Sequence, residues 1–406
     1  MSVFGKIKSY GKDLFFSMGS TLVVSVVTQF ALYPFLAAAL SPTQYGILLS
    51  TMGIVDIIVA TTGRELCNTR LVCDGVCETI DEPPFYLKLL AISGAAGVVA
   101  VLLCSLFLFG YTTAELVLLS VLFVLSSSKA YLLVRVRLNI DFMSLFVANC
   151  VVSAGYLLGL LLFRLSGVWL LVFILGEVLS LVYVLVKTKV RIGRDAQVKS
   201  KKKATETYAS LSASTFIGSL GSYFDRIFIP FALGEASLSV FFAASFLGKI
   251  VFLVSTPLRT VLITYLGNGR VSLSTRTLLG INLAGIVVMA FFAGLCALAG
   301  NVVTSILYPT LYHDAEGIIF WANLAIVLGL GFTINATLIM VAAPSWWQTV
   351  FSTVRVALYA FCALVGTWLS GLLGYAWGVA LANVLMYGAS FCVAYLYCGK
   401  GSAKRG

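Results

Sequence analysis

Five ionisable residues lie inside long apolar stretches of this sequence: Asp56, Glu177, Asp225, Arg226 and Lys249. A charged side chain at the centre of a membrane helix costs about 2.5–3.5 kcal/mol on insertion scales, so each one needs a partner or a function. Cations can hold an anionic substrate through charge-assisted hydrogen bonds, and carboxylates can carry a coupling proton or sodium ion. These residue types therefore favour binding and transport over covalent catalysis.

Two sets of candidate site residues follow from this pattern. The cations are Lys249, Arg64, Arg226 and Arg259 for substrate binding, and the acids are Asp56, Glu177 and Asp225 for ion coupling. Structural interpretations stand beside these roles. Asp56 and Lys249 could form an interhelical ion pair, and Asp225 could pair locally with Arg226. Glu177 could be a packed, hydrogen-bonded acid, and Arg64 and Arg259 could merely end their helices.

The composition indicates which elements must position these residues. Of 406 residues, 60% are hydrophobic and only 11% are charged, and the mean hydropathy is +1.02. A soluble domain carries roughly 25% charged residues, and a membrane span needs about 20 apolar residues. We therefore expect an all-α, multi-pass membrane protein whose first apolar run is retained rather than removed as a signal peptide.

About twelve apolar runs recur along the chain. We expect spans at 14–40, 43–63, 86–109, 113–133, 143–163, 168–187, 208–232, 236–258, 277–297, 317–340, 349–369 and 372–395. With the N-terminus in the cytoplasm, the inner segments hold nearly all Lys and Arg, the outer turns hold none, and Arg164 is the exception. This bias is what the positive-inside rule requires, and it predicts that both termini are cytoplasmic.

The net charge of +11 is then a topology signal, which argues against a nucleic-acid partner. The basic stretch 187–203 could also touch anionic membrane lipids.

The spacing of Cys67, Cys73 and Cys77 matches no zinc pattern, and no histidine is nearby, so we expect no metal site. There is no phosphate-binding glycine loop, and outer-loop carboxylates are few. We expect no cofactor, no catalytic residue and no enzyme activity.

A weak internal repeat divides the chain at the basic stretch. Residues 50–64 and 245–259 share five identities at a constant offset, and Arg64 then corresponds to Arg259. Because six spans precede the second copy, the repeats should be parallel, with a site between them near the midplane. The expected organisation is a six-helix bundle at 1–187, a cytoplasmic linker at 188–207 and a second six-helix bundle at 208–406.

Four segments, in order along the chain, resemble the Wzx-type polysaccharide flippases of the multidrug/oligosaccharidyl-lipid/polysaccharide (MOP) superfamily, which also holds the MATE antiporters and the lipid II flippases. The segments are QFALYPFLAAALSPTQYGILLSTMGIVDII, YFDRIFIPFALGEASLSVFFAASFLGKI, SILYPTLYHDAEGIIFWANLAIVLGLGFTINATLIM and GLLGYAWGVALANVL. One departure is that Val240 or Phe241 stands where the family pattern has a tyrosine.

The resemblance implies flipping of undecaprenyl-diphosphate-linked oligosaccharide across a bacterial cytoplasmic membrane by alternating access, for O-antigen or exopolysaccharide synthesis. It also implies functional partners in the polymerase or ligase machinery. Lys249, Arg64 and Arg226 would then contact the diphosphate, and Gln29, Tyr33, Tyr223 and Asn335 are candidates for the sugars. Two other functions stay open: a cation-coupled drug or metabolite antiporter of the MATE type, and a membrane-embedded glycan polymerase or transferase.

Overall fold

The computed structural model describes residues 16, 18–73, 83–189, 198, 200–253, 274–344 and 346–397. These residues form helices and contain no strand. Among them, nine helices are long and apolar enough to cross a membrane, or ten if one bent pair counts as a single span. The chain is therefore an all-helical, multi-pass membrane protein, as its composition predicts.

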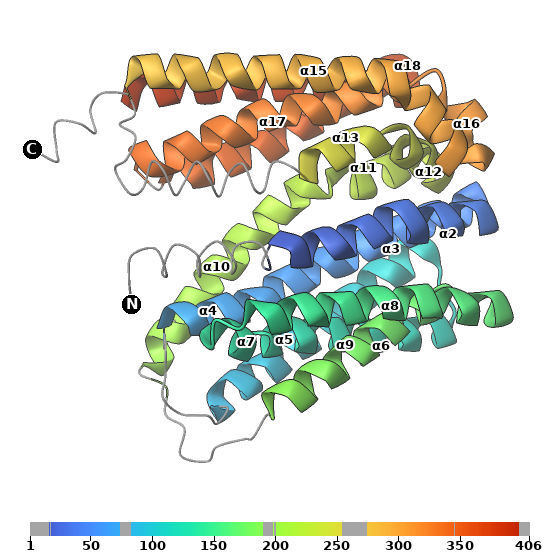
Figure 1. Cartoon of the computed structure of the whole chain (residues 1–406), viewed down its shortest axis with the longest axis vertical. Helices are drawn as coiled ribbons and strands as arrows, with labels where there is room; N and C mark the ends of the chain where they lie inside the picture. Colours follow the sequence, from blue (N-terminus) through green and yellow to red (C-terminus); the bar gives the residue numbers. More distant parts are fainter. Residues whose placement is uncertain are drawn as a thin grey trace, which may run out of the picture. The chain divides into compact units, whose positions relative to one another are not determined.

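The helices gather in two compact units, and the first consists of Met1–Leu36 and Ser50–Ser219. Its helices include η1 (Thr28–Leu32), α3 (Pro42–Val59, shared with the second unit), η2 (Ala60–Arg64), α4 (Glu65–Cys73), α5 (Pro84–Phe109), α6 (Thr113–Leu132), α7 (Val134–Leu138), α8 (Phe142–Ser166), α9 (Leu170–Thr188) and most of α10 (Lys201–Ser222). Helix α9 packs against both α8 and α6 (Figure 1).

Local sequence explains where two of these helices begin. Thr112 and Glu115 form a reciprocal capping box before α6. Asp141 caps α8 by accepting a hydrogen bond from the Ser144 backbone N–H at 3.0 Å. The Ser144 hydroxyl also donates to this carboxylate. Together these bonds from Ser144 lower the pKa of Asp141 below its ordinary value.

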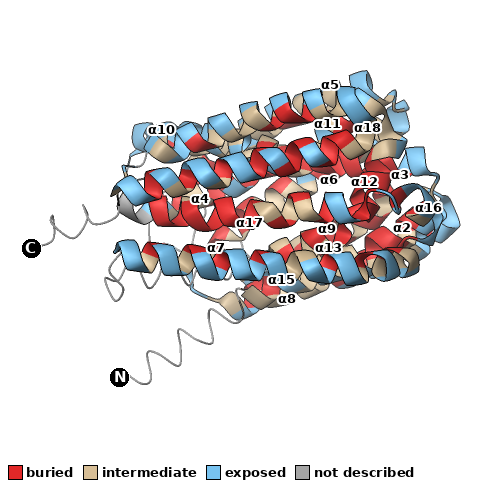
Figure 2. Cartoon of the chain, turned by 90° about the horizontal axis from the view of Figure 1, so that it is seen from above, coloured by how far each residue is buried: buried red, intermediate tan, exposed pale blue. Residues whose placement is uncertain are grey.

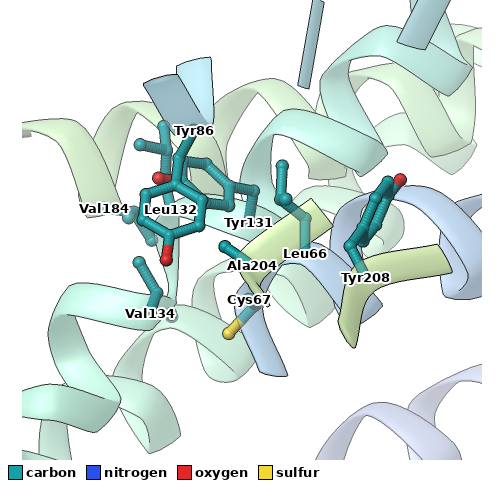
Figure 3. Packing of buried hydrophobic residues seen from close by; sticks show 10 residues of the cluster. Leu66, Cys67, Tyr86, Tyr131, Leu132, Val134, Val184, Ala204 and Tyr208 are labelled. Carbon is teal, nitrogen blue, oxygen red and sulfur yellow. The ribbon is translucent and has the colours of Figure 1, made fainter. Parts of the chain in front are cut away.

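A buried cluster in the first unit draws its side chains from α4, α5, α6, α7, α8, α9 and α10 (Figure 3). Tyr86 and Tyr131 are fully buried in it, and Cys67 packs among them as a small apolar residue. The Arg70 guanidinium lies 5.8 Å from the centre of the Tyr86 ring. This cluster holds α10 against the first unit.

The second unit consists of Ala37–Leu49 and Leu220–Gly406. Its helices include α11 (Phe224–Leu233), α12 (Glu235–Ala244), α13 (Phe246–Leu253), α15 (Thr275–Leu307), α16 (Pro309–Ala315), α17 (Ile319–Ala342) and α18 (Trp346–Tyr397). Helices α15 and α18 both pack against α17 (Figure 1). The predicted domain boundaries rest on the repeat and stay a prediction.

Helix α18 contains two of the predicted spans, 349–369 and 372–395. The break falls at Ser370 and Gly371, where Gly371 takes a φ of 57°, a conformation that favours glycine. The two arms then approach so closely that a Cβ on Gly366, Gly374 or Gly378 would collide with the backbone of the opposite arm. This close packing accounts for Gly374 and Gly378 of the last predicted span.

Burial separates inner helices from helices with a wide exposed face. In α17, 72% of the most apolar window is buried, whereas in α15 only 22% is buried. Exposed residues line α15 and α5 in Figure 2, and on α15 they include Phe291 and Leu298. Lipid tails are as apolar as leucine, so a bilayer accepts such faces.

Candidate functional site

Two breaks interrupt the helices of the second unit. Tyr223 separates α10 from α11 with non-helical backbone angles (φ −109°, ψ 22°). Ser245 separates α12 from α13, which bend by 59°. The predicted spans 208–232 and 236–258 are therefore each broken, and residues 254–258 lie outside the described residues. Broken helices at membrane depth are tolerated where protein or a wet cavity satisfies the released backbone groups, and transporter sites are built from them.

Asn323 of α17 satisfies the groups released at the Ser245 break. The Gly248 backbone N–H donates to its Oδ1 at 2.6 Å, and its Nδ2 donates to the Ala244 carbonyl at 2.7 Å. The Asn323 side chain is fully buried. One amide thus holds both sides of the bend and fixes the turn of α13 that carries Lys249.

We expect Asn323→Ala to lower the free energy of unfolding by about 1–3 kcal/mol, because it leaves the Gly248 N–H and the Ala244 carbonyl buried without these partners. The measurement is thermal unfolding of the purified chain in detergent. Asn139→Ala is the matched control, since Asn139 is exposed after α7 and should change stability by less than about 0.5 kcal/mol. Equal melting temperatures for the two variants would contradict this role.

Lys249, Asp225 and Arg226 form one charged group beside these breaks. The Lys249 Nζ lies 3.4 Å from Asp225 Oδ2, and both side chains are less than one-fifth exposed, at 18% and 17%. Asp225 Oδ1 also accepts the Arg226 backbone N–H at 3.0 Å. Two cations and one carboxylate leave a net charge of +1 on the group.

Aromatic rings surround the two cations. The Phe242 ring lies under both, 3.7 Å from the Lys249 Nζ and 5.6 Å from the Arg226 guanidinium. The guanidinium also lies 5.1 Å from the Tyr223 ring. Such contacts stabilise a desolvated cation by up to about 2 kcal/mol without neutralising its charge.

This arrangement can bind an anion. Charge-assisted N–H···O bonds normally measure about 2.7–2.9 Å, so the 3.4 Å contact of Lys249 with Asp225 is a loose one. Within the described residues the Lys249 Nζ has no hydrogen-bond acceptor, although an ammonium carries three donors. A phosphate oxygen could accept these donors, and the excess positive charge favours it.

Of the residues predicted for the substrate and ion sites, the structure brings together Lys249, Arg226 and Asp225. The ion pair that Lys249 makes is with Asp225, within its own unit. Arg64 ends η2 in the first unit and is exposed, and Asp56 is half-buried in α3. Arg259 lies outside the described residues.

The four predicted sugar contacts have different surroundings. Tyr223 lies beside Arg226. Gln29 falls in the π-helix η1 and Tyr33 directly after it; such π-bulges are frequent at functional sites. Asn335 of α17 is fully buried, and neither atom of its amide has a hydrogen-bond partner among the described residues. Of these four residues, Tyr223 is the one with a described contact to the charged group of the second unit, through Arg226.

A second polar cluster lies in the first unit. The Glu177 carboxylate of α9 pairs with Lys129 of α6 at 2.6 Å and accepts a hydrogen bond from the Tyr156 hydroxyl of α8 at 2.9 Å. Glu177 is only 5% exposed. Glu177 is therefore a packed, ion-paired acid that joins three helices.

Sequence reasoning missed two cations. Lys129 was assigned to a cytoplasmic segment as a topology signal, although it falls inside the predicted span 113–133. Arg355 falls inside the predicted span 349–369 and is not among the predicted site residues. In both cases the signal was a basic residue within an apolar run.

A groove of 330 Å³ opens between α5 and α6 in the first unit. Apolar and small residues line it, including Leu90, Gly94 and Phe123, and its polar side chains are Ser127 and Ser128. Since it contains no charged residue, we assign no anionic group to it.

Comparisons with solved structures define the fold. No family model and no curated protein matches the sequence. The bent form of the Vibrio cholerae MATE transporter VcmN matches with a TM-score of 0.58 at 12% identity, over 96% of this chain and 98% of that one. An outward-facing MATE transporter of the MOP superfamily matches with a TM-score of 0.61 at 14% identity, over 95% and 94%.

The lipid II flippase MurJ, in an inward closed conformation, matches with a TM-score of 0.66 at 13% identity, over 94% of this chain and 86% of that one. The chain therefore has the fold that the MATE transporters and MurJ share. At these identities the likeness defines the fold alone, and the function has to be argued from the residues.

Proposed function

We propose that this chain is a flippase that moves undecaprenyl-diphosphate-linked oligosaccharide from the inner to the outer leaflet of a bacterial cytoplasmic membrane. Its product would feed the polymerase or ligase machinery of surface polysaccharide synthesis. The observation that carries the proposal is the pair of cations, Lys249 and Arg226, held on aromatic rings with one carboxylate at broken membrane helices.

The chemistry of the substrate matches this group. A diphosphate and a sugar unit cannot cross hydrocarbon unaided, since each buried charge or unpaired polar group is costly there. Lys249 and Arg226 would bind the diphosphate by donating hydrogen bonds to it. Arg64 and Arg259 are further candidates to contact the diphosphate. The prenyl chain stays in the bilayer. No bond of the substrate is made or broken, so the proposed activity is transport by alternating access with both termini in the cytoplasm.

Ion coupling is the second part of the proposal. The acids Glu177, Asp56 and Asp225 are the candidates to carry a proton or a sodium ion. One charge moving down a potential of 100 mV supplies about 2.3 kcal/mol, which is enough to bias one conformation over another. Lys129 belongs with Glu177 in such a scheme, because protonation of the acid would release the lysine from its ion pair.

The likeness to MATE transporters supports one alternative, a cation-coupled antiporter of small molecules. The substrate distinguishes the two functions. An antiporter carries a free solute, whereas the flippase acts on a lipid-linked anion that is present in both leaflets.

Deletion of the gene tests the proposal. We expect loss of surface polysaccharide and accumulation of undecaprenyl-diphosphate-linked oligosaccharide in the inner leaflet, measured by mass spectrometry after treatment of intact cells with an impermeant periodate reagent. The wild-type chain expressed from a plasmid should reverse both changes. Normal surface polysaccharide together with increased drug sensitivity would favour the antiporter instead.

A further inference from the structure

Arg355 is the only charged residue in the 52 residues of α18. It lies near the middle of the first arm, in a segment apolar enough to cross a membrane. The adjacent α17 contains no charged residue, and α15 contains no acid. A guanidinium remains protonated in proteins, so Arg355 carries its full charge within the apolar part of the second unit.

The contacts of Arg355 do not neutralise it. Its guanidinium lies 5.2 Å from the Phe332 ring and 5.0 Å from the Tyr359 ring, and Nη2 donates to the Tyr359 hydroxyl at 3.3 Å. The Nε atom is buried and has no hydrogen-bond acceptor in the described part of the chain. Lys249 and Lys129 each have a carboxylate within 4 Å, whereas Arg355 has none among the described residues.

The orientation of Tyr359 keeps the guanidinium available. The Tyr359 hydroxyl donates to Asn383 Oδ1, and the Asn383 amide donates to the Ala325 carbonyl at 2.8 Å. With its proton committed to Asn383, the Tyr359 oxygen can only accept from Arg355. The hydrogen bonds therefore fix the ring under the guanidinium and leave the other donors of Arg355 for a ligand.

A continuous row of aromatic rings joins Arg355 to the charged group of Lys249. Tyr359 contacts Phe224 with ring centres 6.2 Å apart, and Phe224 stacks on Phe228 at 5.2 Å. Phe228 stacks on Tyr375 at 5.7 Å, and Tyr375 contacts Phe241 at 5.0 Å. Phe224 also precedes Asp225 in the chain. The Phe241 ring lies 6.0 Å from the Lys249 Nζ, so Arg355 and Lys249 stand at the two ends of one aromatic row within the second unit.

We infer that Arg355 is a second anion-binding subsite, which binds the phosphate groups of the prenyl diphosphate at a point separate from the Lys249 group. The inference rests on the proposed function, because it takes the substrate class from it. The planar guanidinium suits a phosphate, because it can donate two parallel hydrogen bonds to two phosphate oxygens. Binding of the anion supplies the countercharge that no described residue of the protein supplies.

The test measures binding of farnesyl diphosphate, a short prenyl diphosphate, to the purified full chain by titration calorimetry. Farnesol is the uncharged comparison ligand. We expect Arg355→Gln to weaken binding of farnesyl diphosphate by at least about tenfold, because truncation leaves the phosphate without its buried charged partner. Binding of farnesol should not change. Arg164→Gln is the matched control: Arg164 also lies over a ring, 5.2 Å from the centre of Phe35, but is exposed on α8.

Arg355→Lys covers the case in which the glutamine variant fails to fold. It keeps the charge but loses the paired hydrogen bonds, so we expect weaker binding than in the wild type with an unchanged melting temperature. Unchanged affinity for farnesyl diphosphate in this variant, or in a folded Arg355→Gln variant, would overturn the inference and leave the proposed function standing. If the wild-type chain binds farnesyl diphosphate no better than farnesol, the proposed function itself fails.

Discussion

Lys249→Ala is expected to abolish surface polysaccharide while the protein is expressed and inserted normally. The substitution removes the ammonium that we propose binds the substrate and leaves the Asp225 carboxylate, so the charge summed over Lys249, Asp225 and Arg226 falls from +1 to 0. Removing one partner of a buried hydrogen-bonded charge pair typically costs about 2–5 kcal/mol of binding energy. The measurement is polysaccharide on the cell surface, normalised to protein in the membrane fraction.

A double variant separates binding from simple neutralisation of Asp225. If Lys249 only compensates the carboxylate, Lys249→Ala combined with Asp225→Asn should restore the polysaccharide, because the carboxylate that needs compensation is gone. Our account predicts that the double variant stays inactive, since it lacks the cation that binds the diphosphate. Lys202→Ala is the control, because Lys202 is 88% exposed on α10. Full activity of Lys249→Ala would remove Lys249 from the site.

Glu177→Ala is expected to be the most destabilising single substitution in the first unit, by about 3–5 kcal/mol, because it leaves the Lys129 ammonium buried without its countercharge. The Lys129 and Glu177 side chains are only 15% and 7% exposed, so water cannot replace the lost partner. Tyr156→Phe removes one hydrogen bond from the same carboxylate and should cost only about 1 kcal/mol. Thermal unfolding of the purified variants measures both effects.

The double variant Lys129→Met with Glu177→Leu is the matched control. Replacing a buried ion pair by apolar residues of similar size is often neutral or stabilising, so this variant should be more stable than Glu177→Ala. If the two melt alike, the cost does not come from the unpaired lysine. If Glu177→Ala melts like the wild type, the ion pair contributes no stability.

The amino-acid sequence predicts much of the fold because apolar length is a strong signal. The predicted spans 349–369 and 372–395 are the two arms of α18, and the glycine at position 371 stands at their break. The bends at Tyr223 and Ser245 were not predicted, since hydropathy does not report backbone angles. The Asn323 side chain that holds one bend comes from a distant helix, and no local pattern indicates such a contact.

The candidate site was predicted in its residues but not in its pairing. A charged residue in an apolar run stands out in the sequence, so Lys249, Asp225 and Arg226 can be selected as candidates, and their role as a site stays a prediction. Which acid meets which base depends on how helices pack: the sequence suggests Asp56 for Lys249 and Arg226 for Asp225, whereas the structure pairs Lys249 with Asp225. The charge pattern does not single out Lys129 and Arg355, because a basic residue near a span is also a topology signal.

Transport by purified protein in liposomes tests the central claim most directly. Fluorescent undecaprenyl-diphosphate-linked oligosaccharide is placed in both leaflets, and an impermeant enzyme that cleaves the glycan is added outside. With the wild-type chain we predict that nearly all of the lipid is cleaved, whereas with Lys249→Ala, as with empty liposomes, the reaction stops at about the half in the outer leaflet. Equal cleavage with the wild-type chain and with empty liposomes would contradict the account.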